Sequence, residues 1–126
     1  MEYNFLSKTI LIVEDDDVSR YFFEKALKKT QANLFFVNTG MEAIQMIREN
    51  TEIDAVLMDI RLPGMNGLEA TIKIKEINPE MPVIIQTAYE MSSAKEDAMK
   101  SGCNDFITKP INMKTLFSLL QKHLIY

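Results

Sequence analysis

Five polar side chains in this sequence could together hold a metal ion and a phosphoryl group. They are Glu14, Asp15, Asp59, Thr87 and Lys109, and each lies just beyond, or at the end of, a run of residues predicted to form a strand. Carboxylates that are packed together repel one another and call for a divalent cation, and ligands that are all oxygen favour a hard ion such as Mg²⁺. A lysine ammonium and a threonine hydroxyl would bind an anion. The set therefore predicts a site in which a carboxylate accepts a phosphoryl group.

Asp59 is the most informative of these residues. It ends an apolar run at 55–58 and is followed by a turn rich in proline, glycine and asparagine at 63–67. The run is typical of a buried strand, and the turn residues end that strand. Asp59 is thus expected at the carboxyl end of a core strand, where open α/β sheets bind their ligands. Burying an aspartate there is costly unless it meets a cation or takes part in chemistry.

Each of these residues also has a simpler interpretation when it is taken alone. Residues 14–17 could be a solvated acidic first turn of a helix, and Asp59 could be a turn residue. Thr87 could be an ordinary strand residue, and Lys109 could be a surface lysine before Pro110. Their joint placement at the ends of four predicted strands favours the functional interpretation.

The rest of the sequence alternates strand and helix patterns. Strands are predicted at 9–13, 34–37, 55–58, 82–86 and 105–108, and helices at 17–29, 40–50, 67–78, 92–101 and 113–123. In the first helix we expect Phe22, Phe23, Ala26 and Leu27 to form the buried stripe. This alternation predicts an α/β fold, a doubly wound parallel sheet with helices on both faces.

Length and composition predict one compact domain over residues 1–126. The chain has 47% hydrophobic and 25% charged residues and a net charge of −4, so direct nucleic-acid binding is not expected. No apolar run approaches the roughly 20 residues of a membrane span, and residues 1–6 lack a signal-peptide pattern. Cys103 is the single cysteine, which excludes an internal disulfide and a multi-cysteine zinc site and predicts a reducing, cytoplasmic setting.

Four segments resemble, in order and spacing, the motifs of response regulator receiver domains of two-component signalling. They are residues 10–15, 57–67, 84–88 and 105–110, and the resemblance covers about residues 8–124. It implies a flavodoxin-like, five-stranded sheet of order 2-1-3-4-5. Residues 86–89 and 109–112 are similar to receivers fused to hybrid histidine kinases, and a free-standing receiver is the alternative. No residue specifies an oligomeric state.

The resemblance implies a magnesium-dependent phosphorelay function centred on Asp59. Asp59 would accept a phosphoryl group from a phosphohistidine on a histidine kinase or a histidine phosphotransfer protein. Asp15, Asp59 and the backbone carbonyl of Arg61 would bind Mg²⁺ directly, and Glu14 would act through a water. By itself the domain is not expected to be an enzyme beyond self-phosphorylation and slow autodephosphorylation, whereas a hybrid parent protein would be a histidine kinase.

The resemblance also implies how the phosphoryl group is bound and how it would change the surface. Thr87, Lys109 and the backbone N–H of Ala88 would contact the phosphoryl oxygens. Thr87 would move toward the new charge and Phe106 would turn inward, so the surface of the fourth helix, fifth strand and fifth helix would change for a downstream effector. A plain core aromatic is the alternative for Phe106. Tyr89 and Arg61 are expected to affect the phosphoryl lifetime.

Three other functions were weighed against the same residues. A phosphatase of the haloacid-dehalogenase type would carry a second aspartate at the position of Arg61, so this class is rejected. A phosphorylation-independent docking module would usually lack an acidic residue, the acceptor or the lysine, and none of these is missing. A dinucleotide site would need a Gly-x-Gly-x-x-Gly segment after Val13, where the sequence has none.

Overall fold

The computed structural model describes residues 3–50, 52–88 and 92–125, and over these segments strands and helices alternate. The strands are β1 (Thr9–Val13), β2 (Asn33–Val37), β3 (Ala55–Asp59), β4 (Val83–Thr87) and β5 (Asp105–Thr108). The helices are α1 (Asp17–Lys28), α2 (Gly40–Glu49), α3 (Gly67–Ile77), α4 (Ser92–Lys100) and α5 (Met113–Leu124). Each predicted element is present, and its ends differ from the prediction by no more than one residue.

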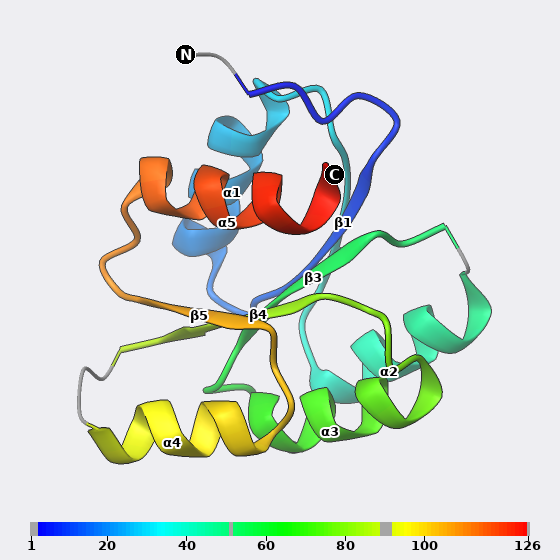
Figure 1. Ribbon diagram of the computed structural model, residues 1–126, viewed down its shortest axis with the longest axis vertical. Coiled ribbons are helices and arrows are strands. Elements are labelled where there is room, and N and C mark those ends of the chain that lie inside the picture. The colour runs from blue at the N-terminus through cyan, green and yellow to red at the C-terminus, as the bar shows by residue number, and fades with distance from the viewer. Residues whose placement is uncertain (1–2, 51, 89–91, 126) are drawn as a thin grey trace.

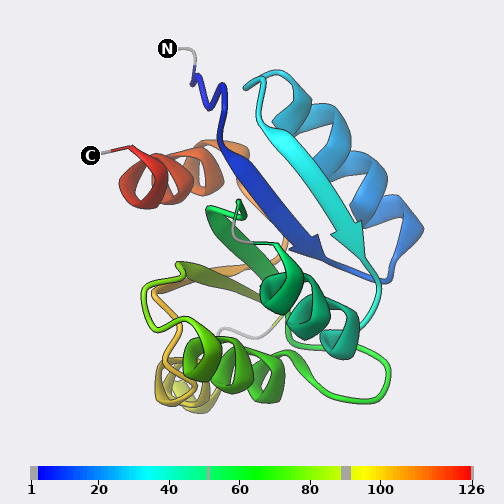
Figure 2. The ribbon, with the colours of Figure 1, turned by 90° about the vertical axis from the view of Figure 1, so that its right-hand side faces the viewer.

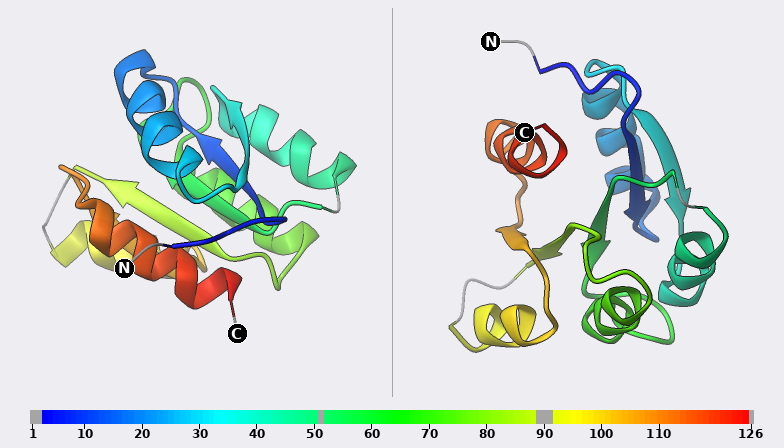
Figure 3. Two further views of the ribbon diagram at one scale, coloured as in Figure 1. Left: turned by 90° about the horizontal axis from the view of Figure 1, so that it is seen from above. Right: turned by 45° about the vertical axis from the view of Figure 1, so that its right-hand side comes forward.

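The strands form one parallel sheet of order β2-β1-β3-β4-β5. Helices α1 and α5 cover one face, and α2, α3 and α4 cover the other (Figure 1). The same two layers of helices around the twisted sheet can be followed in Figures 2 and 3. The predicted doubly wound, flavodoxin-like α/β fold is confirmed.

The three central strands β1, β3 and β4 are buried at every residue, because the sheet has a hydrophobic core on each face. The side chains of successive residues of β1 point to opposite faces of the sheet. Ile10 and Ile12 pack in the core under α1 and α5, whereas Leu11 and Val13 pack in the core under α2, α3 and α4. Burial on both faces explains why these strands are continuous apolar runs in the sequence instead of alternating ones.

The prediction for the buried stripe of α1 was partly wrong. Phe23 and Leu27 are buried against the sheet, but Phe22 is 43% exposed and Ala26 is half-buried. Phe23 and Leu27 are four residues apart and therefore share one side of the helix. Phe22 is turned away from that side by about 100°, so it lies at the border of the core and not within it.

The junction between β3 and α3 fixes the position of Asp59. The side chain of Asn66 caps α3 by accepting hydrogen bonds from the backbone N–H groups of Leu68 and Glu69. The N–H of Gly67 donates to the Ile60 carbonyl at 2.8 Å. A Cβ atom at Gly67 would lie 2.0 Å from the carbonyl oxygen of Asp59. The first turn of α3 can therefore approach the end of β3 only because this residue has no side chain.

We predict that Gly67→Ala destabilises the protein by about 2 kcal/mol or more, because the added methyl group must displace the backbone of Asp59. The sign of this stability change is informative, because a Gly→Ala substitution in a helix ordinarily stabilises the helix by up to about 1 kcal/mol. Urea unfolding followed by circular dichroism measures the difference. Glu69→Ala changes an exposed residue of the same turn and should stay within about 0.5 kcal/mol of wild type. A Gly67→Ala protein as stable as wild type would contradict the close approach.

Candidate functional site

Three carboxylates meet at the carboxyl edge of the sheet. Strands β1 and β3 are neighbours, with Val13 opposite Met58, so the residues that follow Val13 lie beside the last residue of β3. Glu14, Asp15 and Asp59 each contribute a carboxylate oxygen to a group in which these atoms lie within 4.8 Å of one another. Glu14 and Asp59 are only 1% and 4% exposed, whereas Asp15 is exposed to solvent. The cluster is thus buried at Glu14 and Asp59 and has an exposed rim at Asp15.

The ammonium group of Lys109 faces this cluster. Its Nζ lies 3.4 Å from Asp59 Oδ2 and 3.9 Å from Glu14 Oε1. The lysine follows β5, and its backbone N–H donates to the Thr87 carbonyl at 2.8 Å, which ties the loop after β5 to the end of β4. One ammonium group shared between two buried carboxylates leaves their charge only partly compensated.

Glu14 is the carboxylate that is most perturbed by this arrangement. Burial first, and then the charge of Asp59, raise its pKa from 4.5 to about 7. Two interactions oppose this shift: Asp16 N–H donates to Glu14 Oε2 at 3.2 Å, and Lys109 attracts the carboxylate. Among the described residues, the buried Glu14 Oε1 has no hydrogen-bond partner. A cation would satisfy that oxygen, so the residues present fit a hard divalent ion such as Mg²⁺.

Backbone groups hold the Asp59 side chain in place. Arg61 N–H lies 3.4 Å from Asp59 Oδ1, and Ile60 N–H donates to the Gln86 carbonyl at 3.3 Å. The backbone of Arg61 therefore lies beside the Asp59 carboxylate, while the Arg61 side chain is exposed to solvent. Coordination by its carbonyl stays a prediction.

Thr87 ends β4 on the same edge and is buried, and Ala88, the next residue, is exposed. Because Asp59 pairs in register with Gln86, Thr87 lies one residue beyond Asp59 along the neighbouring strand. The predicted phosphate-binding groups are thus brought to the same edge as the carboxylates. Their contacts with a phosphoryl group stay predictions.

Phe106 lies in β5 opposite Ile85 of β4. It is half-buried and packs against the core under α2, α3 and α4. This placement is compatible with both interpretations of Phe106, as a core aromatic and as a switch residue. Tyr89 lies outside the described residues.

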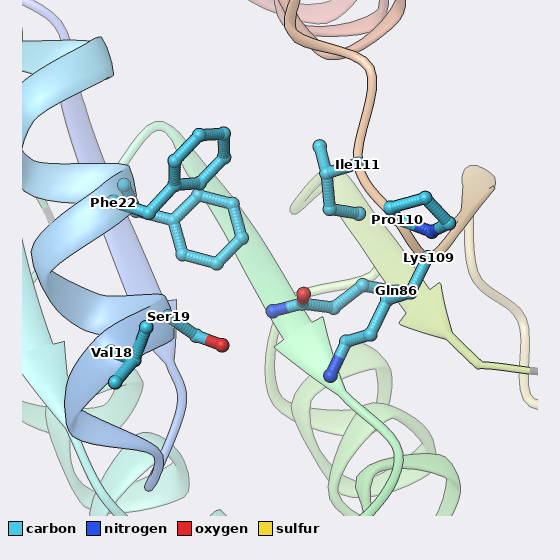
Figure 4. Close-up of a pocket in the computed structure, with 8 residues that line it drawn as sticks. Val18, Ser19, Phe22, Gln86, Lys109, Pro110 and Ile111 are labelled. Carbon is cyan, nitrogen blue, oxygen red and sulfur yellow. The ribbon is translucent and has the colours of Figure 1, made fainter.

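Sequence reasoning missed Gln86. This residue follows three apolar residues in the middle of a core strand, and its side chain is fully buried next to the site. The available signal was a polar amide at the end of an apolar run, directly before Thr87. Figure 4 shows in addition that the Gln86 amide points toward α1.

Within the segments that the structure describes, the helices are too short or too polar to cross a membrane.

The chain matches the family model of the response regulator receiver domain over residues 10–121. A cyclic di-GMP phosphodiesterase from Thermotoga maritima is 37% identical over 108 residues, which are 86% of this chain and 28% of that protein. The polar-differentiation response regulator DivK from Brucella ovis is 31% identical over 121 residues, which are 94% of this chain and 98% of that protein.

A solved structure shows the same fold. The receiver domain of a sensor histidine kinase from Pseudomonas aeruginosa, which has a magnesium ion coordinated in its active site cleft, is 31% identical and has a TM-score of 0.86. The match covers 94% of this chain and 98% of that domain. The chain thus spans about a quarter of the phosphodiesterase but nearly the whole of DivK and of the kinase receiver.

We predict that Glu14→Gln stabilises the metal-free protein at neutral and alkaline pH. The pKa of Glu14 is raised on folding, so its favourable contribution is complete below pH 4.5 and is lost as the pH rises through about 7. Glutamine resembles the protonated form at every pH. In EDTA, the variant should be more stable than wild type by about 1–3 kcal/mol at about pH 8, and this gap should close below pH 4.5.

Urea unfolding at several pH values measures this difference. Glu24→Gln, which changes an exposed carboxylate on α1, serves as the matched control and should show no such gap. Equal stability of wild type and Glu14→Gln at alkaline pH would contradict an unfavourable buried charge at Glu14.

Proposed function

This chain belongs to the family of response regulator receiver domains, and we propose that it accepts a phosphoryl group on Asp59 in a two-component phosphorelay. The observation that carries the proposal is the buried carboxylate at the end of β3, with the Lys109 ammonium 3.4 Å away and two further carboxylates beside it. The donor would be a phosphohistidine on a histidine kinase or on a histidine phosphotransfer protein.

In the proposed step, an oxygen of Asp59 attacks phosphorus and forms an acyl phosphate. The bond from phosphorus to the histidine nitrogen breaks, and its electron pair stays on the imidazole, which takes up a proton. Lys109 balances the charge of the transferred oxygens, and the Thr87 hydroxyl and Ala88 N–H donate hydrogen bonds to them. The protein contributes mainly position and charge neutralisation, as is general for phosphoryl transfer.

We propose that Asp15, Asp59 and the Arg61 carbonyl hold Mg²⁺, with Glu14 acting through a water. When bound, the ion would neutralise charge on the phosphoryl oxygens. The raised pKa of Glu14, and the lack of a hydrogen-bond partner for its Oε1 among the described residues, support this assignment, because Lys109, 3.9 Å from that oxygen, only partly offsets the cost of burial and the charge of Asp59. The exposed rim at Asp15 leaves the cluster open to solvent, from which an ion and a donor can enter.

Phosphorylation would change the surface formed by α4, β5 and α5. The modification adds about −1.5 to −2 charges at Asp59, and we propose that the Thr87 hydroxyl shifts toward them. Phe106 would then turn inward, and because it has no hydroxyl its movement would act through packing alone. The register of Ile85 with Phe106 supports this coupling, since the strands that carry Thr87 and Phe106 are hydrogen-bonded neighbours. The changed surface would bind a downstream effector through a population shift.

Two settings are compatible with this function. The receiver of a sensor histidine kinase and the response regulator DivK are both similar to this chain over most of its length. We favour a receiver of a hybrid kinase, on the sequence similarity at residues 86–89 and 109–112, with a free-standing receiver as the alternative. The cytoplasm stays the predicted compartment, since Cys103 is a free, buried thiol.

Acetyl phosphate with Mg²⁺ should add the mass of a single phosphoryl group to the intact protein, and EDTA should abolish the adduct. Asp59→Asn should show none, because the amide is a poor nucleophile. Asp97→Asn changes an exposed carboxylate on α4 and should be phosphorylated as wild type. Intact-mass spectrometry gives the readout.

Magnesium titration followed by NMR completes this experiment, since the chain has no tryptophan to report binding. Mg²⁺ binding without an adduct in wild type would point to donor choice or a short-lived acyl phosphate, and a phosphohistidine donor would then decide. The absence of both binding and adduct would overturn the proposal, and a phosphorylation-independent docking module would become the better explanation.

Thr87→Ala should separate phosphorylation from switching. We expect the variant to form the adduct on Asp59, while NMR shifts of Phe106 and of α4, β5 and α5 on phosphorylation fall to less than about half of the wild-type values, because the moving hydroxyl is gone. Thr115→Ala, at an exposed position of α5, is the control. Wild-type shifts in phosphorylated Thr87→Ala would contradict the role of Thr87.

A further inference from the structure

A cavity of about 390 Å³ lies between α1 and the loop that follows β5. Its walls include Val18, Ser19 and Phe22 of α1, Gln86 of β4, and Lys109 and Ile111 of the loop. Figure 4 shows the Gln86 amide projecting into this space, toward Ser19 and Phe22. Val18 and Phe22 are 77% and 43% exposed, so the cavity can be reached from solvent.

The buried end of the cavity carries an unsatisfied amide. Gln86 is fully buried, yet among the described residues neither its Nε2 nor its Oε1 has a hydrogen-bond partner. Residues of β4 alternate between the two faces of the sheet, and Gln86 follows Ile84 onto the face covered by α1 and α5. Buried polar groups in native proteins are rarely left unpaired, because the cost of desolvation is then not recovered. The amide therefore calls for a polar partner on the side of the cavity, which water or a ligand could supply.

The remaining walls indicate what kind of molecule this is. A volume of about 390 Å³ lies in the range of small-molecule sites, which are mostly apolar with a few placed polar groups. Val18, Phe22 and Ile111 give the cavity apolar sides. Water in this cavity finds few polar partners on the walls, and displacing such poorly ordered water with an apolar group gains affinity.

We propose that this cavity binds a small neutral ligand with a planar apolar ring and an amide or lactam group that pairs with Gln86. The ligand carbonyl accepts a hydrogen bond from Nε2, and the ligand N–H donates to Oε1, so both unsatisfied atoms gain partners. The ring lies against Phe22 and the aliphatic side chains of Val18 and Ile111.

A neutral ligand is favoured by the charges around the cavity. In the unphosphorylated protein the Lys109 ammonium pairs with Asp59 and Glu14, so a ligand anion in the cavity would have to compete with these two carboxylates for it. An anion would also lie near those carboxylates, which repel it. The Gln86 amide itself is uncharged and offers one donor edge and one acceptor edge, which match another amide.

NMR titration of the full, isotope-labelled chain tests this proposal with benzamide, toluene and benzoate as probes. We expect benzamide to shift the side-chain N–H₂ of Gln86 and the methyl groups of Val18 and Ile111 in a saturable manner. Toluene and benzoate should bind at least about fivefold more weakly, the ratio expected for one net hydrogen bond. Intermolecular NOEs from benzamide to the Gln86 N–H₂ should be observed.

Gln86→Leu provides the matching variant, since it replaces the unsatisfied amide by an apolar group of similar size. It should bind toluene at least as well as benzamide, whereas Gln45→Leu, the same change at an exposed position of α2, should keep the wild-type preference. Should Gln86→Leu not fold, the ranking of the probes and the NOEs in wild type still decide.

Equal binding of benzamide and toluene to wild type, or an unchanged preference in Gln86→Leu, would overturn the amide pairing. The absence of saturable shifts with every probe would overturn the site itself and leave water as the occupant of the cavity. The titration uses unphosphorylated protein, so its outcome is independent of the phosphorylation of Asp59.

Discussion

The structure depends on holding two buried carboxylates next to each other at the edge of a parallel sheet. Glu14 and Asp59 repel one another, and burial strengthens that repulsion because water no longer screens it. They are held together because β1 and β3 are adjacent strands whose apolar residues are buried on both faces. The energy of burying that core opposes the electrostatic cost of the site. The raised pKa of Glu14 is the direct sign of this conflict.

The same constraint explains the loops around the site. Gly67 packs closely on the backbone of Asp59, and the backbone N–H of Lys109 donates to the Thr87 carbonyl, so the backbone that carries each of the two charged groups is anchored. A cluster whose negative charge is only partly compensated by Lys109, on an anchored backbone, is suited to take up a cation from solution. The buried carboxylates thus lower the folding stability at the place where a ligand would bind, as is general for functional sites.

Most of the fold could be predicted because its signals are local. Apolar runs, turn residues and helix periodicity placed every element, and the strand ends brought Glu14, Asp59, Thr87 and Lys109 to one edge. The orientation of Phe22 could not be predicted, because packing against the sheet decides which side of α1 is buried. The unsatisfied Gln86 amide was hidden for a similar reason: whether a buried group has a partner depends on neighbours from other elements.

Lys109 belongs to both the carboxylate cluster and the cavity lined by Gln86, and this links the two regions physically. Its ammonium lies closer to Asp59 than to Glu14, so a change of charge at Asp59 acts on it first. Asp59 and Gln86 are also paired in register on neighbouring strands. A molecule in the cavity that contacts the Lys109 side chain would favour one position of the ammonium group over another. Thermodynamic linkage then requires the reverse effect: occupancy of Asp59 must change the affinity of the cavity by the same factor.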